Sequence, residues 1–152
     1  MYKRKYAAIL RLIAMLLVIT LALPVSVSAA VEDPVQPRGS YYLNSYNAYV
    51  YPAGNGEVEV WFTVTGTDDL DELGALSIQL YESPDNINWY RAITFTHNYT
   101  SGMLGYDDYF YASHVDYQGV KGYYYKAYVC IWGGRDGNGD TRYFWTSAKK
   151  AT

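Results

Sequence analysis

An unbroken alternation of apolar and polar side chains runs through residues 57–66, EVEVWFTVTG. Successive side chains of a β-strand point to opposite faces of the sheet, so a repeat of two residues predicts a strand. The set on one face is Val58, Val60, Phe62 and Val64. The set on the other face is Glu57, Glu59, Trp61, Thr63 and Thr65. Acids on one side only indicate a sheet with one face on a core and one face in water.

Similar segments recur along the chain, separated by short stretches of turn residues. They are residues 45–52, 76–82, 89–95, 107–117, 122–132 and 140–148. With residues 57–66 they predict seven strands, and their close spacing favours an all-β sandwich or barrel over βαβ units. The stretches AGNG, SPDNIN and GGRDGNG are expected to turn the chain between strands.

Two details of this prediction concern the middle of the chain. In TDDLDELGA, acids come early, Leu70 and Leu73 are one helical turn apart, and Gly74 follows. This arrangement predicts a one-turn helix that joins two strands. In the strand after SPDNIN, the alternation places Trp89, Ile93 and Phe95 on one face, with Arg91 among them as an exception.

One lysine orients the very aromatic segment 122–132, GYYYKAYVCIW. Lysine is almost never buried without a partner, so Lys126 is expected to face water. The residues that share its face are Tyr124, Tyr128, Cys130 and Trp132. The residues of the opposite face, which suit a core, are Tyr123, Tyr125, Ala127, Val129 and Ile131.

The N-terminus has the three parts of a secretory signal peptide. Basic residues open it, an apolar run of about twelve residues follows, and small residues end it near Ala30. The run is shorter than the roughly 20 residues of a membrane-spanning helix. Residues 1–30 are therefore expected to be cleaved, although retention as an anchor is the alternative, and no stable membrane span is expected afterwards. Residues 31–40, which contain two prolines, a glycine and a serine, are expected to form a flexible lead-in.

Removal of residues 1–30 changes the charge of the chain. That segment carries four of the twelve Lys and Arg and none of the fifteen Asp and Glu, which leaves eight basic and fifteen acidic residues, a net charge of −7. Phosphate backbones attract basic patches, so a nucleic-acid partner is not expected. The single cysteine, Cys130, allows no disulfide within the chain. It is expected to be a small residue in a strand, with a bridge between two chains as the alternative.

Residues 125–127, YKA, resemble the tyrosine corner of immunoglobulin-like sandwiches, with Ala127 where antibody domains place a cysteine. Fibronectin type III domains also lack that cysteine. The domain at residues 41–150 is thus identified as a seven-stranded antiparallel immunoglobulin-like or fibronectin type III-like sandwich. The chain looks like small secreted β-sandwich proteins of Gram-positive bacteria. This resemblance implies a fold and an extracellular, cell-surface location, but no activity.

The predicted water side of this domain gathers aromatic rings. The proposed ligand-binding residues are Tyr81, Tyr124, Tyr128, Trp132, Tyr143 and Trp145. Large exposed apolar patches mark interaction sites, and rings stack on sugars and on protein partners alike. The sequence favours a non-catalytic module for wall glycan or polysaccharide. The alternatives are a protein-interaction or self-assembling structural module, and rings that only stabilise the sheet through cross-strand pairs.

Other polar groups suggest weaker hypotheses. Asp136, Asn138 and Asp140 resemble the start of a calcium loop, but Thr141 and Ser147 stand where its Gly and Glu belong, so a hairpin turn is preferred. Asp68 and its acidic neighbours fit the N-terminus of the predicted helix. His97 and His114 lack a metal-ligand spacing, and no serine has a nucleophile context. We therefore predict no catalytic residues, no metal and no cofactor.

Overall fold

The computed structural model describes residues 40–152, so the predicted signal peptide and residues 31–39 of the lead-in lie outside the described residues. This part of the chain is all β and its strands pair antiparallel. The strands are β1 (Leu43–Gly54), β2 (Glu57–Ser83), β3 (Tyr90–Thr96), β4 (Leu104–Gln118), β5 (Tyr124–Arg135), β6 (Asn138–Trp145) and β7 (Lys149–Lys150). The predicted all-β class is confirmed.

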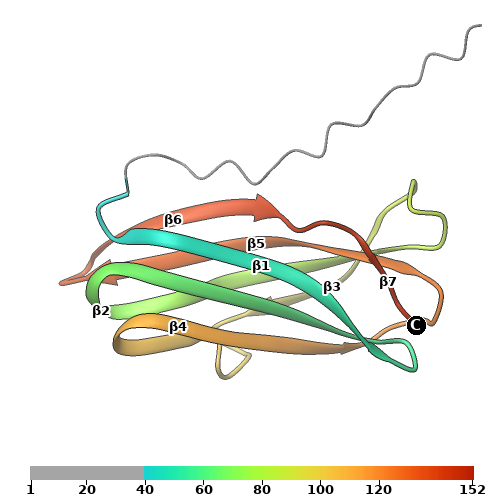
Figure 1. The fold of residues 1–152 in the computed structure, drawn as a ribbon, viewed down its shortest axis with the longest axis horizontal. Helices are drawn as coiled ribbons and strands as arrows, with labels where there is room; N and C mark the ends of the chain where they lie inside the picture. Colours follow the sequence, from blue (N-terminus) through green and yellow to red (C-terminus); the bar gives the residue numbers. More distant parts are fainter. Residues whose placement is uncertain (1–39) are drawn as a thin grey trace, which may run out of the picture. The chain divides into compact units, whose positions relative to one another are not determined.

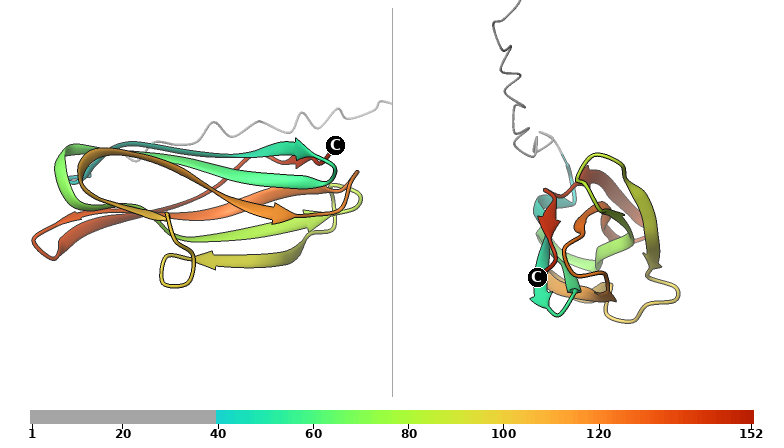
Figure 2. Two further views of the ribbon diagram at one scale, coloured as in Figure 1. Left: turned by 90° about the horizontal axis from the view of Figure 1, so that it is seen from below. Right: turned by 90° about the vertical axis from the view of Figure 1, so that its right-hand side faces the viewer.

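The long strand β2 organises the fold because it belongs to both layers. Its first part, residues 57–65, pairs with β1 on one side and with β4 on the other. Its last part, residues 77–83, lies between β3 and β5, and β5 pairs in turn with β6 and β7. β2 bends back at one end of the molecule and passes from the front layer to the rear layer (Figure 1). Two layers of strands therefore face each other (Figure 2).

The bend of β2 occupies the segment for which a one-turn helix was predicted, and that prediction is wrong. Residues 67–75 are extended and belong to β2, with an irregular register between Thr65 and Leu70. Leu70 and Leu73 are both buried. Two apolar residues three apart mimic a helical turn in the sequence, but a kinked strand also brings such a pair to one face. The acids here cap no helix; Asp68, Asp69, Asp71 and Glu72 are exposed on a strand.

Alternating residues of the strands fill the space between the layers. From the front layer, Val58, Val60, Phe62 and Val64 are fully buried, as predicted. From the rear layer, Ile78 and Leu80 of β2 are fully buried. The layers also meet at one margin, where the rings of Tyr46 on β1 and Phe144 on β6 lie 5.2 Å apart. The core is thus built from period-two strands packed face to face.

Tyr125 closes one end of this core with both its ring and its hydroxyl. The side chain is fully buried, and its hydroxyl accepts a hydrogen bond from the Val120 backbone N–H at 2.7 Å. The hydroxyl also lies 3.2 Å from Oε2 of Glu82, to which it donates. A side chain on Gly119 would collide with this hydroxyl, because a Cβ there would lie 2.5 Å from it. Burial is the main reason why the pKa of Tyr125 is raised to about 12.

Candidate functional site

The orientation predicted for β5 is confirmed. Tyr125, Ala127, Val129 and Ile131 are fully buried, while Tyr124, Lys126, Tyr128 and Trp132 are half-buried on the outer face. Tyr123 lies just before the strand and packs against the core. Because neighbouring strands pair in fixed register, this alternation also sets which residues of β2 and β6 lie beside the outer rings.

Four of the six proposed binding residues form one cluster on the outer face of the rear layer. The ring of Tyr128 lies 4.9 Å from that of Trp145 and 6.0 Å from that of Tyr143. Tyr81 of β2 meets Trp145 edge-on at 5.1 Å. Tyr143 is 60% exposed and Trp145 48% exposed, so the cluster faces solvent. We call Tyr81, Tyr128, Tyr143 and Trp145 the aromatic platform.

The structure adds Trp89 to this face, which the sequence prediction had placed with Ile93 and Phe95. β3 contains a register shift opposite Leu80 and Tyr81, so that Leu80 pairs with Ile93 but Tyr81 pairs with Arg91. The bulge turns Arg91, and Trp89 beyond the end of the strand, toward the outer face, while Ile93 and Phe95 pack on the core.

Lys126 joins Trp89 to the platform. Its ammonium lies 4.2 Å from the ring centre of Trp89 and 4.8 Å from that of Trp145. The ammonium is attracted to the faces of both indole rings. This attraction stabilises the positions of the two rings and sets the distance between them. The lysine that oriented the strand in the sequence is therefore part of the candidate site itself.

The other two proposed residues lie at opposite ends of the same outer face. Tyr124 lies beside β7, where the ammonium of Lys150 is 5.3 Å from its ring centre. Trp132 is four residues beyond Tyr128, or roughly 13 Å along the strand. The rings therefore form a line along β5 whose centre is the platform, rather than a single packed cluster.

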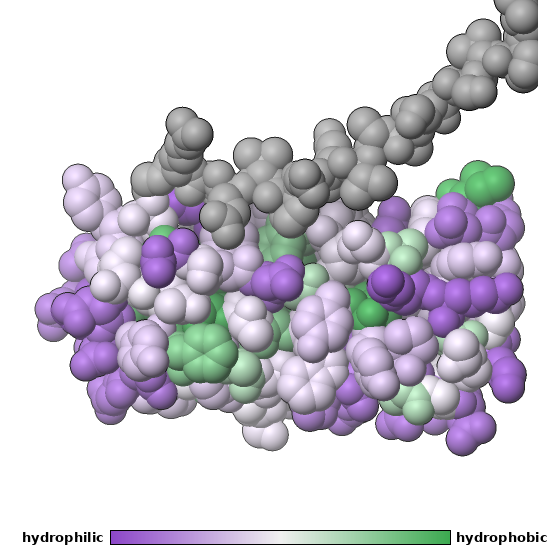
Figure 3. Space-filling view, viewed as in Figure 1, coloured by the Kyte–Doolittle hydropathy of each residue, from purple (hydrophilic) through white to green (hydrophobic). Residues whose placement is uncertain are grey.

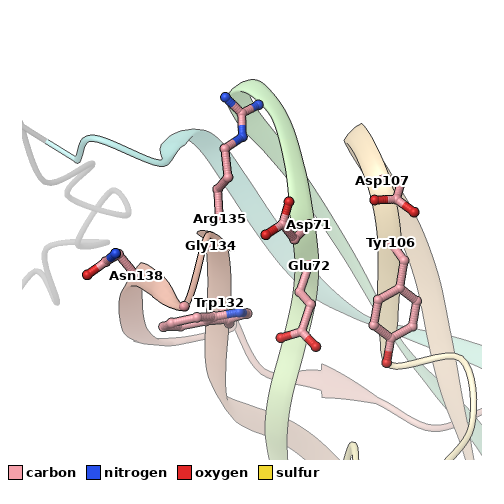
Figure 4. Close-up of a pocket in the computed structure, with 9 residues that line it drawn as sticks. Asp71, Glu72, Tyr106, Asp107, Trp132, Gly134, Arg135 and Asn138 are labelled. Atoms are coloured by element: carbon pink, nitrogen blue, oxygen red, sulfur yellow. The ribbon is translucent and has the colours of Figure 1, made fainter.

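Trp132 lines a cleft where β2, β4 and the β5–β6 hairpin meet (Figure 4). The cleft has a volume of about 480 Å³, and a second hollow of about 440 Å³ shares Glu72, Tyr106 and Trp132 with it. The nitrogen end of the indole points toward Glu72, with Tyr106 beyond it. That nitrogen is buried and has no hydrogen-bond partner among the described residues.

Two glycines allow the indole of Trp132 to lie flat against the hairpin. A Cβ on Gly134 would lie 2.5 Å from the indole carbon Cζ2, and one on Gly139 would lie 2.4 Å from Cη2. The hairpin that carries them turns at Asp136 and Gly137, which both have positive φ. This confirms the predicted glycine-rich turn.

Charged groups differ between the two ends of the face. Lys126, Arg91 and Lys150 lie near the Tyr124 end. The cleft at the Trp132 end is lined by the carboxylates of Asp71, Glu72 and Asp107, and by the guanidinium of Arg135. Arg135 also bonds Asp68 at 3.3 Å. The backbone N–H of Asp69, then Arg135, lower the pKa of the Asp68 carboxyl.

Cys130 shares the outer face but is covered. It is only 4% exposed. Burial raises the pKa of its thiol, and hydrogen bonds with Tyr143 and Ser77 offset part of this rise. A disulfide needs the two sulfur atoms about 2 Å apart, which a covered thiol does not reach. The structure therefore disagrees with a Cys130 bridge between folded chains and agrees with a buried strand residue.

Polar groups of the candidate calcium segment, residues 136–140, form hydrogen bonds with other residues of the protein. One carboxylate oxygen of Asp140 accepts from the hydroxyl of Ser40 and from the backbone N–H groups of Tyr41 and Tyr42. The N–H of Asp136 donates to Asp71. Among residues 40–152, no three His, Cys, Asp or Glu gather in a group that could hold a metal ion.

The two histidines lie in different surroundings. One ring nitrogen of His97 lies 3.3 Å from the Leu76 carbonyl oxygen. His114 stands on the outer face of the front layer, stacked on Trp61 at 4.3 Å and 3.5 Å from the Asp116 carboxylate.

Within the described part of the chain, no helix has the length and apolar character needed to cross a membrane. No protein-family model matches the chain, and no match was found among curated proteins or solved structures.

Proposed function

We propose that this chain is a secreted, non-catalytic module that binds a polysaccharide of the cell surface through the aromatic platform. The observation that carries the proposal is the line of rings on the outer face of β5 and its neighbours, of which Tyr143 and Trp145 are exposed and the others half-buried. Exposed rings in contact with one another offer flat apolar surface to the faces of sugar rings, while tyrosine hydroxyls supply hydrogen bonds.

The length of the face supports a polymer as the ligand. From Tyr124 to Trp132 the strand rises by eight residues, or roughly 26 Å. A chain of several sugar units laid along β5 would meet the rings in succession. Many weak stacking contacts on one rigid sheet then add up without a deep pocket.

Charge refines the choice of polymer. Lys126 and Arg91 beside the platform favour sugar units that carry carboxylate or phosphate. At the Trp132 end, the carboxylates of Glu72 and Asp107 are acceptors for sugar hydroxyls. We therefore propose an acidic polysaccharide, bound with its charged groups near Trp89.

The proposal includes a finer fold assignment, an immunoglobulin-like sandwich of the fibronectin type III kind. It is supported by one layer of β1, the first part of β2 and β4, and another of β3, the last part of β2, β5 and β6. The buried hydroxyl of Tyr125, bonded to backbone five residues upstream, also fits the tyrosine corner. Origin from a Gram-positive bacterium, cleavage after residue 30 and a cell-surface location belong to the same proposal.

A sedimentation assay with insoluble wall polysaccharide, freed of peptide, tests this function. The wild-type protein should sediment with the polysaccharide. Trp145→Ala and Trp89→Ala should each weaken binding about five- to a hundredfold, at about 1–3 kcal/mol per stacked ring. Trp61→Ala, on the opposite layer, is the matched control and should bind as wild type. Equal binding by all four proteins would contradict the proposal.

The self-assembling alternative has one observation in its favour. β6 pairs only with β5 among the described strands, which leaves its other edge open. Open edges are templates for pairing with another chain. Light scattering over a wide concentration range tests it: a species that grows with concentration supports assembly, and a constant monomer mass contradicts it.

A further inference from the structure

A second group of rings lies on the outer face of the front layer, away from the aromatic platform. Tyr49 and Tyr51 project from β1, and Trp61 and Glu59 project from β2. These four residues line a hollow of about 230 Å³. Figure 3 shows pale ring-bearing residues in the middle of this face, with strongly hydrophilic residues toward both ends.

The pairing of β1 with β2 sets how the four residues are arranged around this hollow. Tyr49 lies opposite Trp61, and Tyr51 lies opposite Glu59. Directly opposite residues on an antiparallel pair have Cβ atoms about 5 Å apart, so three rings and one carboxylate surround a common space. Tyr49 is 45% exposed and Tyr51 is 52% exposed, so the hollow is open to solvent.

Two contacts hold the central ring in place. The indole N–H of Trp61 donates to Oε2 of Glu59, which sets the carboxylate beside the ring. His114 stacks on the indole at 4.3 Å with an angle of 23° between the planes. The Trp61 ring and the Glu59 carboxylate are therefore placed before any ligand arrives, which reduces the entropy lost on binding.

The charge of this layer favours a ligand of positive charge. β1, the first ten residues of β2, and β4 contain no Lys or Arg. Glu57, Glu59 and Asp116 alternate with the outward rings. Among the described residues of these three strand segments, the one basic group is the imidazole of His114, which lies 3.5 Å from Asp116. An acidic face lined with rings attracts cations.

We propose that Tyr49, Tyr51, Trp61 and Glu59 form an aromatic cage that binds a quaternary ammonium group. Ring faces attract a cation. A quaternary ammonium ion is weakly hydrated, so it loses little hydration free energy when it moves from water to the rings. A primary ammonium needs hydrogen-bond acceptors on three sides, whereas the hollow offers one carboxylate that already accepts from Trp61. This site is independent of the polysaccharide function proposed above.

The test is an NMR titration of the purified protein with choline chloride, in which each of the four tryptophans gives one indole N–H signal. Choline should shift the Trp61 signal in a saturable way and leave those of Trp89 and Trp145 in place. The neutral isostere 3,3-dimethyl-1-butanol has the same shape without the charge, and it should give no saturable shift. Lysine should bind more weakly than choline.

Variants give a second measurement. Tyr49→Leu and Tyr51→Leu should each weaken choline binding about two- to fivefold, as expected for one cation–ring contact. Glu59→Gln keeps the shape of the side chain and should weaken binding through loss of the charge. Trp145→Ala, on the other layer, should leave choline binding unchanged.

Three results would overturn the proposal. They are an equal shift with choline and with the isostere, no saturable shift of Trp61 with choline, and tighter binding of lysine than of choline. The comparison of ligands uses the wild-type protein, so it decides the matter even if a variant fails to fold. If the wild-type protein binds polysaccharide but does not bind choline, the cage is rejected and the platform is retained.

Discussion

Replacement of Tyr125 by Phe removes one hydroxyl from the core and keeps the ring. The hydroxyl accepts from the Val120 N–H at 2.7 Å and donates to the Glu82 carboxylate at 3.2 Å. A neutral hydrogen bond contributes about 1 kcal/mol, and a bond to a charged group about 1.5–3 kcal/mol. Because the second bond is long, we take the low end for it and expect Tyr125→Phe to lower the free energy of unfolding by about 2.5 kcal/mol.

The same hydroxyl makes stability depend on pH. The pKa of Tyr125 rises from 10.0 to about 12 on folding, mainly through burial. A raised phenol pKa means that the folded state holds the proton more tightly than the unfolded state. Its contribution is therefore complete below pH 10 and is lost as pH rises toward 12. The full loss is about 3 kcal/mol, because each unit of difference in pKa corresponds to about 1.4 kcal/mol. Tyr125→Phe should lack this part of the alkaline destabilisation.

Urea unfolding followed by tryptophan fluorescence measures both effects, at pH 7 and at steps from pH 9 to pH 12. The matched control is Tyr51→Phe, whose ring is 52% exposed, and which should change stability by less than about 0.5 kcal/mol. If Tyr125→Phe were as stable as Tyr51→Phe at pH 7, or lost stability as steeply as wild type above pH 10, the reasoning would be refuted.

Two further predictions concern the outer face of β5. Gly139→Ala should displace the Trp132 indole, which a Cβ would approach to 2.4 Å, and should lower stability by about 1–3 kcal/mol. Urea unfolding and the indole N–H signal measure this, and an unmoved Trp132 signal would contradict it. Cys130, at 4% exposure, should react slowly with a thiol reagent in the folded protein and fast in urea, and should form no reducible dimer. Rapid labelling without urea would show that the thiol is accessible.

The sequence predicted β5 well because one lysine fixed the orientation of an alternating segment. With Lys126 in water, period-two alternation placed Tyr125, Val129 and Ile131 inside, and all three are fully buried. Tyr143 and Trp145 were expected on the outer face of the next strand if Phe144 faced inward. Phe144 packs against the core, and Tyr143 and Trp145 lie beside Tyr128. The residues of the platform were therefore predicted from local sequence patterns.

The count of seven strands agrees with the structure only because two errors cancel. Two predicted strands, 57–66 and 76–82, are parts of the single strand β2, and the two-residue β7 was not predicted. Acids followed by Leu70 and Leu73 suit both a short helix and a bent strand. The pairing of residues 70–74 with β4 decides between them, and this long-range contact leaves no local signal.

The errors around Trp89 and Trp132 have a similar origin. The bulge in β3 changes which face Trp89 occupies, and alternation read without the partner strand does not reveal an extra residue. Trp132 was placed on the correct face, but its cleft depends on Glu72 and Tyr106, which are distant in the chain. The cage around Trp61 was missed because its rings lie on two strands whose register was not predicted.

The central claim is that polysaccharide lies on the rear layer, along β5. The most direct measurement is an NMR titration with soluble glycan fragments released from Gram-positive wall by muramidase, monitored at the four indole N–H signals. We predict that the signals of Trp89 and Trp145 shift together and saturate, that Trp132 follows with longer fragments, and that Trp61 stays in place. A shift of Trp61 alone, or no shift of Trp89 and Trp145 at saturating glycan, would contradict the claim.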